Sequence, residues 1–256
     1  MKTGKCKLCN QTKPLLNKSH IIPDFFYAQA GLYNEKHQIH KIDVQKFIKN
    51  KSFTLIPTGV YDKGILCEKC DNNLLGGLET YGRKVLYGGL KFHEEISCKN
   101  LRNPHDGFEY SICKNVDYKR FKLFLLSILW RAAISTNPVF KNVDFSNNYI
   151  ETLRKMLFEM NPGKINDFPI ITLSNIKNNS IPSDLICEPI KSETSESTLI
   201  TFLLSDFIFV FHVAQNIEET ETIKFFSPST SNRFGIMHIP EKRAWNFILK
   251  FMNIIK

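Results

Sequence analysis

The chain has 256 residues, of which 43% are hydrophobic, so it can bury a core and extended disorder is excluded. Residues 1–100 carry 16 basic and 9 acidic side chains, a net charge of +7, whereas residues 101–256 carry 18 and 16, a net charge of +2. A basic segment of this kind is typical of proteins that meet a polyanion, although solubility alone can also account for it.

No membrane association is expected. The longest apolar stretch, residues 199–214, is interrupted by Ser205, Asp206 and His212, and it is shorter than the roughly 20 apolar residues of a membrane span. The N-terminal residues lack the apolar segment of a secretory signal. We therefore expect a cytoplasmic protein.

In the first hundred residues the pattern predicts two helices. Pro23 and Asp24 can open a short helix through Ala30. Residues 71–90 have apolar side chains at helical spacing, and a Gly-Gly pair ends that segment at residues 88–89. Residues 24–60 are expected to be an insertion in this part of the chain.

A polar stretch at residues 99–107 indicates a boundary, so we expect one domain over residues 1–100 and another over 105–256. In the second domain the patterns predict helices and strands in an α+β arrangement. The helices are expected at 118–135, 147–160 and 241–255, and the strands at 168–173, 198–204 and 207–213.

Four of the seven cysteines form two CxxC pairs, Cys6 with Cys9 and Cys67 with Cys70. Two such pairs supply the four thiolates of a tetrahedral structural zinc site. Structural zinc has no open coordination position, so any catalysis must come from other residues. The remaining cysteines, Cys98, Cys113 and Cys187, lack this spacing and are expected to be ordinary buried thiols. An odd number of cysteines with no export signal argues against a disulfide framework.

Between the two pairs lies the sequence SHIIP, residues 19–23, and the second pair continues as ILCEKCDNNLLGGLE. The order CKLC, SHIIP, CEKC resembles the HNH (ββα-metal) nuclease family, in which an (Asp/His)-His-Ile-x-Pro strand lies between two CxxC pairs and the second pair opens a helix. The resemblance covers about residues 1–90. It implies a zinc-stapled ββα-metal module, here joined to a larger C-terminal α+β domain, and a role in defence against phage or plasmids.

The resemblance also implies roles for single residues. His20 matches the general base that deprotonates the attacking water, and a neutral imidazole suits that role near neutral pH. The metal ligand that normally precedes the base is Ser19 here, and Asp71 replaces the last histidine of the family as a hard ligand for Mg²⁺ or Mn²⁺. Glu79 could complete the site. The middle asparagine of the family has no clear counterpart, although Asp62 lies about where it would fall.

Each of these residues also has a purely structural interpretation. His20 could be a packed strand residue, Asp71 could be the N-cap of the following helix, and Glu79 could be a surface carboxylate. Arg131 lies in the most apolar predicted helix, where an arginine needs a partner, and an internal salt bridge is favoured.

The predicted insertion contains basic side chains that could meet nucleic acid. Lys46, Lys49 and Lys51 lie near two phenylalanines and could follow a phosphate backbone. His37 and His40 could contact nucleic acid or be solvated. A run of charges is more often a solvated surface, so these assignments depend on the nuclease hypothesis.

Three functional hypotheses follow. The first is a metal-dependent endonuclease that hydrolyses phosphodiester bonds in DNA, with structural Zn²⁺, catalytic Mg²⁺ or Mn²⁺, and a C-terminal domain that regulates it or binds a protein partner. The second is a catalytically degenerate zinc module that binds nucleic acid or protein, which the loss of the ligand at Ser19 favours. The third is an effector nuclease that stays inactive until a partner or signal arrives.

Overall fold

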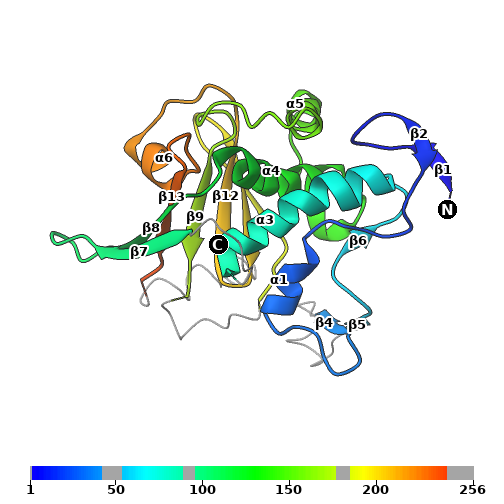
Figure 1. Cartoon of the computed structure of the whole chain (residues 1–256), viewed down its shortest axis with the longest axis horizontal. Coiled ribbons are helices and arrows are strands. Elements are labelled where there is room, and N and C mark those ends of the chain that lie inside the picture. Colours follow the sequence, from blue (N-terminus) through cyan, green and yellow to red (C-terminus); the bar gives the residue numbers. More distant parts are fainter. Residues whose placement is uncertain (1, 42–53, 89–95, 177–184, 241–256) are drawn as a thin grey trace.

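A computed structural model describes residues 2–41, 54–88, 96–176 and 185–240. These residues form a mixture of helices and strands, as the predicted α+β class requires (Figure 1). The N-terminal part holds three short antiparallel pairings: β1 (Thr3–Lys5) with β2 (Thr12–Pro14), β3 (Ser19–His20) with β6 (Tyr61–Asp62), and β4 (Ile39–Lys41) with β5 (Thr54–Ile56).

Two helical segments complete the N-terminal part. The short helix α1 (Asp24–Gln29) occupies the predicted place. The helix predicted over residues 71–90 begins two residues earlier, as the π-helix η1 (Lys69–Leu75), and continues as α3 (Gly76–Tyr87). The helix ends at Gly88, whose φ of +67° is the left-handed conformation that glycine adopts most readily.

The C-terminal part is built on a seven-stranded sheet with the order β10-β11-β12-β9-β13-β8-β7. Neighbouring strands are antiparallel except β9 and β13, which are parallel. The strands are β7 (Ser97–Arg102), β8 (Glu109–Lys114), β9 (Ile170–Ser174), β10 (Ile190–Glu193), β11 (Thr198–Leu204), β12 (Phe207–Val213) and β13 (Arg233–His238). The polar stretch predicted to be a domain boundary thus belongs largely to the β7–β8 hairpin at the edge of this sheet.

Helices cover both faces of the sheet. On one face lies α4 (Tyr118–Ile134), whose Phe121 packs against Phe234 of β13 with ring centroids 4.6 Å apart. On the other face α6 (Glu221–Phe226) packs over Ile171 of β9. Two further elements follow α4, the short 3₁₀ helix η2 (Pro138–Phe140) and α5 (Asn147–Phe158). Of the helices in the described residues, none combines the length and the apolar character that crossing a membrane requires.

The sequence predicted some of the local elements of this part and none of the strand pairing. The strands β11 and β12 lie where the pattern placed them, and α4 and α5 match within two residues. The strands β7, β8, β10 and β13 and the helix α6 were not predicted. The helix predicted at residues 241–255 lies outside the described residues.

One hydrophobic core continues from the N-terminal part into the C-terminal part. Phe26 of α1 lies between the two, with ring centroids 6.5 Å from Phe124 of α4 and 6.2 Å from Phe209 of β12. The helix α3 runs along α4 (Figure 1). A side chain at Gly82 of α3 would place its Cβ 2.4 Å from the Phe124 ring, so the two helices approach closely at this glycine. The two-domain division remains a prediction, but the packing between the parts is extensive.

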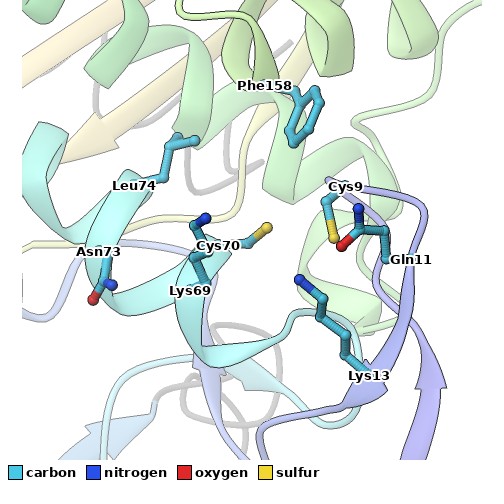
Figure 2. Close-up of a pocket in the computed structure, with 8 residues that line it drawn as sticks. All are labelled: Cys9, Gln11, Lys13, Lys69, Cys70, Asn73, Leu74 and Phe158. Carbon is cyan, nitrogen blue, oxygen red and sulfur yellow. The ribbon is translucent and has the colours of Figure 1, made fainter.

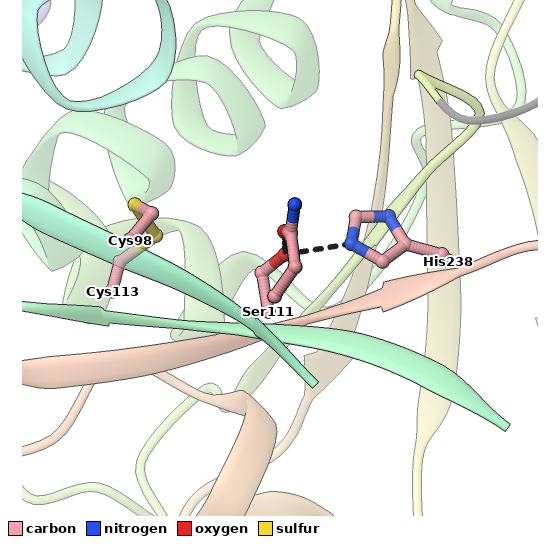
Figure 3. The surroundings of a disulfide bond; sticks show 5 residues. Cys98, Ser111, Cys113 and His238 are labelled. Carbon is pink, nitrogen blue, oxygen red and sulfur yellow. Dashed lines mark hydrogen bonds between the residues drawn. A yellow bond between two sulfur atoms is a disulfide. The ribbon is translucent and has the colours of Figure 1, made fainter. Parts of the chain in front are cut away.

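A disulfide joins Cys98 and Cys113, which corrects the expectation that both are free thiols (Figure 3). The register of β7 and β8 places the two cysteines directly opposite each other, with Cα atoms 4.0 Å apart. The sequence did not reveal this pairing because the hairpin itself was not predicted. Close by, Ser111 Oγ lies 2.7 Å from His238 Nε2. Cys187 is a half-buried free thiol, as expected.

The contact at Gly82 can be tested with Gly82→Ala. The added methyl group overpacks the α3–α4 contact, so we expect the free energy of unfolding to fall by about 1–3 kcal/mol. Gly77→Ala is the matched control, because Gly77 lies exposed in the same helix with open space around it. That variant should gain about 0.5–1 kcal/mol. Chemical denaturation measures both, and equal effects of the two variants would contradict the close approach.

Candidate metal centre and active site

The first cysteine pair lies in the turn of the β1–β2 hairpin. The backbone N–H of Cys6 donates to the Gln11 carbonyl at 3.0 Å, and the N–H of Asn10 donates to the Cys6 carbonyl at 2.9 Å. Asn10 closes the turn with a φ of +60°, a conformation that asparagine tolerates better than most residues. The turn thereby presents Cys6 and Cys9 to the same side.

The second pair lies at the start of η1, where the N–H groups of Cys70 and Asp71 both donate to the Cys67 carbonyl at 3.0 Å. The N–H of Cys67 donates to Cys6 Sγ at 3.4 Å, and this hydrogen bond connects the two cysteine pairs. All four sulfur atoms lie within 4.8 Å of one another. A zinc ion with Zn–S bonds of about 2.3 Å separates its sulfurs by about 3.8 Å, and the cluster fits that geometry. Four cysteines are therefore positioned to hold a metal ion, consistent with structural zinc.

The surroundings of the thiols explain why a metal ion would stabilise them. Burial raises the pKa of Cys67 and Cys70. Burial also acts on Cys6, but the backbone N–H groups of Cys9 and Cys67 outweigh it, and the pKa of Cys6 is lowered. Without a cation, burial therefore opposes the ionisation of Cys67 and Cys70, although Cys6 ionises more readily. A zinc ion resolves this conflict because it deprotonates its ligands and compensates their charge.

Zinc removal should destabilise the N-terminal part. We expect wild-type protein to contain about one zinc ion per chain and Cys67→Ser to lose it, with a lower melting temperature and exposed apolar surface. Cys187→Ser, at a free cysteine outside the cluster, should keep both zinc and stability. Elemental analysis and thermal melting measure these quantities. Zinc retained by Cys67→Ser would exclude the four-cysteine site.

His20 lies on β3, and its imidazole is surrounded by residues from the predicted insertion. Its Nε2 lies 3.1 Å from Thr58 Oγ1 and 3.8 Å from Asp24 Oδ1. Tyr33 donates its hydroxyl hydrogen to the same Asp24 oxygen, and the Tyr33 ring stacks on His37 with centroids 3.9 Å apart. About a quarter of the His20 side chain is exposed, so water can reach it.

The ionisation of His20 suits a base. Burial lowers its pKa below the ordinary value, and the nearby Asp24 carboxylate opposes this effect only in part. Lys18 also lowers the pKa, whereas Glu79 raises it. The imidazole is consequently neutral near pH 7 and can accept a proton.

Ser19 and Asp71 lie close together away from this imidazole, because successive strand residues point to opposite sides. The Ser19 side chain is fully buried, and its hydroxyl forms no hydrogen bond. The hydroxyl nevertheless lies close enough to the Asp71 carboxyl to lower its pKa. Burial is the larger effect and raises the pKa of Asp71 overall. The alternative that Asp71 is a helix N-cap is wrong, because η1 begins at Lys69 with Glu68 as its N-cap.

Arg131 of α4 occupies the space next to these carboxylates. Its side chain is 1% exposed, and Nη1 donates to Glu79 Oε1 at 2.5 Å and to the backbone carbonyl of His20 at 2.9 Å. Its charge also lowers the pKa of Asp71. The predicted internal salt bridge of Arg131 is confirmed, and Glu79 is its partner.

A divalent cation at Asp71 and Glu79 would have to compete with the guanidinium of Arg131. In the described part of the chain, the four cysteines are the only group of three or more His, Cys, Asp or Glu donors within 4.8 Å of one another. Asp71 and Glu79 thus do not belong to a cluster of three or more such donors among the described residues. The roles of Asp71 and Glu79 as metal ligands remain predictions.

Glu79→Gln tests which role the carboxylate has. If Glu79 is the counter-ion of Arg131, the variant leaves a buried cation without its charged partner, and the free energy of unfolding should fall by about 2 kcal/mol. The control Glu68→Gln changes an exposed carboxylate at the start of η1 and should stay within about 0.5 kcal/mol. Denaturation without added metal measures both variants. Unchanged stability of Glu79→Gln would instead favour a metal-ligand role.

The sequence did not reveal Asp24, Tyr33 and Thr58 as neighbours of His20. Asp24 lies four residues after His20, and this spacing was the one local signal. Thr58 reaches the imidazole only through tertiary folding, and Tyr33 likewise reaches Asp24 and Thr58 only in the folded chain. Asp62 is not part of this group, because its carboxylate accepts from the Thr136 N–H at 3.0 Å. The three predicted phosphate-binding lysines, Lys46, Lys49 and Lys51, lie outside the described residues.

Comparisons with protein-family models, with curated proteins and with solved structures gave no match to this chain. The resemblance to HNH nucleases therefore remains a prediction from the motifs of residues 1–90.

Proposed function

We propose that the protein is a phosphodiester hydrolase that acts on nucleic acid, with His20 as the general base. The observation that carries the proposal is the half-buried, neutral imidazole of His20 beside the Asp24 carboxylate, on a strand that lies between the two cysteine pairs in the sequence. The motif order of residues 1–90 supports the same assignment.

The chemistry proposed for His20 is proton abstraction from a water that attacks phosphorus. A neutral imidazole accepts that proton and becomes an imidazolium, which the Asp24 carboxylate at 3.8 Å stabilises. The bond from phosphorus to the leaving ester oxygen breaks in the same reaction, and that oxygen takes up a proton from solvent. Tyr33 and Thr58 hold the carboxylate and the imidazole in place through hydrogen bonds. Lys18 lies near enough to influence the pKa of His20, and its charge would stabilise the negative phosphate in the transition state.

Nucleic acid is favoured as the substrate by charge. Residues 2–23 contain five lysines and no acidic residue, and the whole segment of residues 1–100 has a net charge of +7. Such a surface attracts a polyanion through its phosphates.

The first test is plasmid nicking by wild type and His20→Ala in the presence of Mg²⁺, Mn²⁺ or a chelator. We expect wild type to nick and His20→Ala to lose at least about 100-fold in rate, because general-base catalysis contributes about 10²–10⁴-fold. The control His105→Ala removes an exposed histidine of the β7–β8 hairpin and should nick like wild type. Zinc content and melting temperature confirm that both variants fold. Equal nicking by wild type and His20→Ala would reject His20 as the base.

The pH dependence provides a second test. Because the neutral imidazole is the active form, the rate should rise with pH and reach half of its maximum below pH 6.5. Asp24→Asn removes the charge that raises the pKa of His20, so this acid limb should move to lower pH. Glu35→Gln, at an exposed residue absent from the charges that shift His20, should leave the limb in place. A limb that moves upward in Asp24→Asn would contradict the assignment.

A second candidate is a zinc module that binds nucleic acid without cleaving it. The observation that favours it is the ion pair of Glu79 with Arg131, which neutralises one of the predicted metal ligands. It predicts binding by wild type and His20→Ala alike, with no cleavage by either under any metal condition.

A further inference from the structure

A pocket of about 330 Å³ lies beside the four-cysteine cluster, where the β1–β2 hairpin, η1 and α5 meet (Figure 2). Cys9 and Cys70 form part of its wall, and their sulfurs face each other. Its volume is in the range of pockets that hold small molecules. The pocket is distinct from the surroundings of His20.

The polar lining of the pocket is basic. Lys13 extends into it from β2, and Lys69 lies at the start of η1 (Figure 2). The lining contributed by the described residues has no carboxylate. A zinc ion with four thiolates would carry a net charge of −2. The two lysines would therefore either balance that charge or bind an external anion.

The apolar lining includes an aromatic ring that faces solvent. Phe158, at the end of α5, is 44% exposed, and Leu74 of η1 also lines the pocket. The end of α5 is fixed against the first cysteine pair, because Arg154 Nη1 donates to the Leu8 carbonyl at 2.6 Å. The Phe158 ring lies across the pocket from Lys13, with Cys9 and Cys70 between them (Figure 2). An exposed ring in a pocket that is also lined by cations is an arrangement on which proteins stack unpaired bases.

The π-helical form of η1 explains why the pocket and the His20 region are separate. In a π-helix with i→i+5 hydrogen bonds, residues four or five apart lie on the same side. Lys69, Asn73 and Leu74 consequently line the pocket together. Asp71 points to the other side, toward Ser19 and Arg131.

We propose that this pocket binds one unpaired nucleotide of a single-stranded nucleic acid. Phe158 stacks on the base, and Lys13 and Lys69 hold the adjoining phosphate. Gln11 lies on the rim, where its amide can hydrogen-bond to the base edge. The proposal rests on the proposed function only in taking nucleic acid as the ligand, because binding in this pocket does not require cleavage at His20.

The experiment measures the fluorescence anisotropy of a labelled 15-nucleotide oligothymidine with zinc-loaded protein in the His20→Ala background. We expect Lys13→Glu and Lys69→Glu each to weaken binding at least tenfold. The slope of the logarithm of the binding constant against the logarithm of the salt concentration should become shallower by about 0.7, the value for one lost phosphate contact on a single strand. Phe158→Ala should weaken binding by about 5- to 150-fold, as loss of one stacked base does. Lys13→Gln and Lys69→Gln should act in the same direction with smaller losses.

The control is Lys99→Glu, at an exposed lysine of β7, on the opposite side of the molecule from β1–β2 (Figure 1). It should bind within about twofold of the parent protein. The proposal is overturned if the pocket variants lose no more affinity than Lys99→Glu, or if Lys13→Glu and Lys69→Glu lose zinc and leave oligonucleotide affinity unchanged. It is also overturned if duplex of the same length binds more tightly and Phe158→Ala has no effect. Intact binding without cleavage by wild type would reject the proposed hydrolase and leave the pocket assignment standing.

Discussion

The buried guanidinium of Arg131 is the constraint on which the candidate active site depends. A cation that is 1% exposed must find its acceptors within the protein, since an unpaired buried charge is strongly destabilising. Arg131 finds them in the Glu79 carboxylate on α3, in the His20 carbonyl on β3 and in Ser127 of its own helix. One side chain of α4 thus fixes both the strand that carries the imidazole and the helix that follows the second cysteine pair.

Local sequence patterns were enough to predict the elements with long apolar, β-branched or aromatic runs. The apolar run of α4 and the β-branched and aromatic runs of β11 and β12 are examples. The two CxxC pairs were equally clear, because metal ligands have a spacing that few other constraints produce. His20 could be singled out for a similar reason, since it lies within a short and unusual motif between those pairs.

The residues around His20 could not be predicted, because distant segments supply them. Thr58 approaches the imidazole only after residues 19–20 pair with residues 61–62. Tyr33 reaches Asp24 and Thr58 only after the chain turns beyond α1. The disulfide of Cys98 and Cys113 is a similar case, since it depends on the register of a hairpin whose polar residues resembled a linker. The described parts of the predicted insertion, residues 24–60, therefore supply the side chains that surround His20.

The close packing of α3 on α4 bears on how such a protein can evolve. Gly82 leaves no room for a larger residue opposite Phe124, and Arg131 leaves no freedom in the position of β3. A gene rearrangement that joined residues 1–90 to a different partner would lose both contacts, and β3 would keep only its pairing with β6 and the contacts of His20 within this segment. A substitution on one side of the α3–α4 contact or of the Arg131 side chain therefore changes the packing of both parts of the chain.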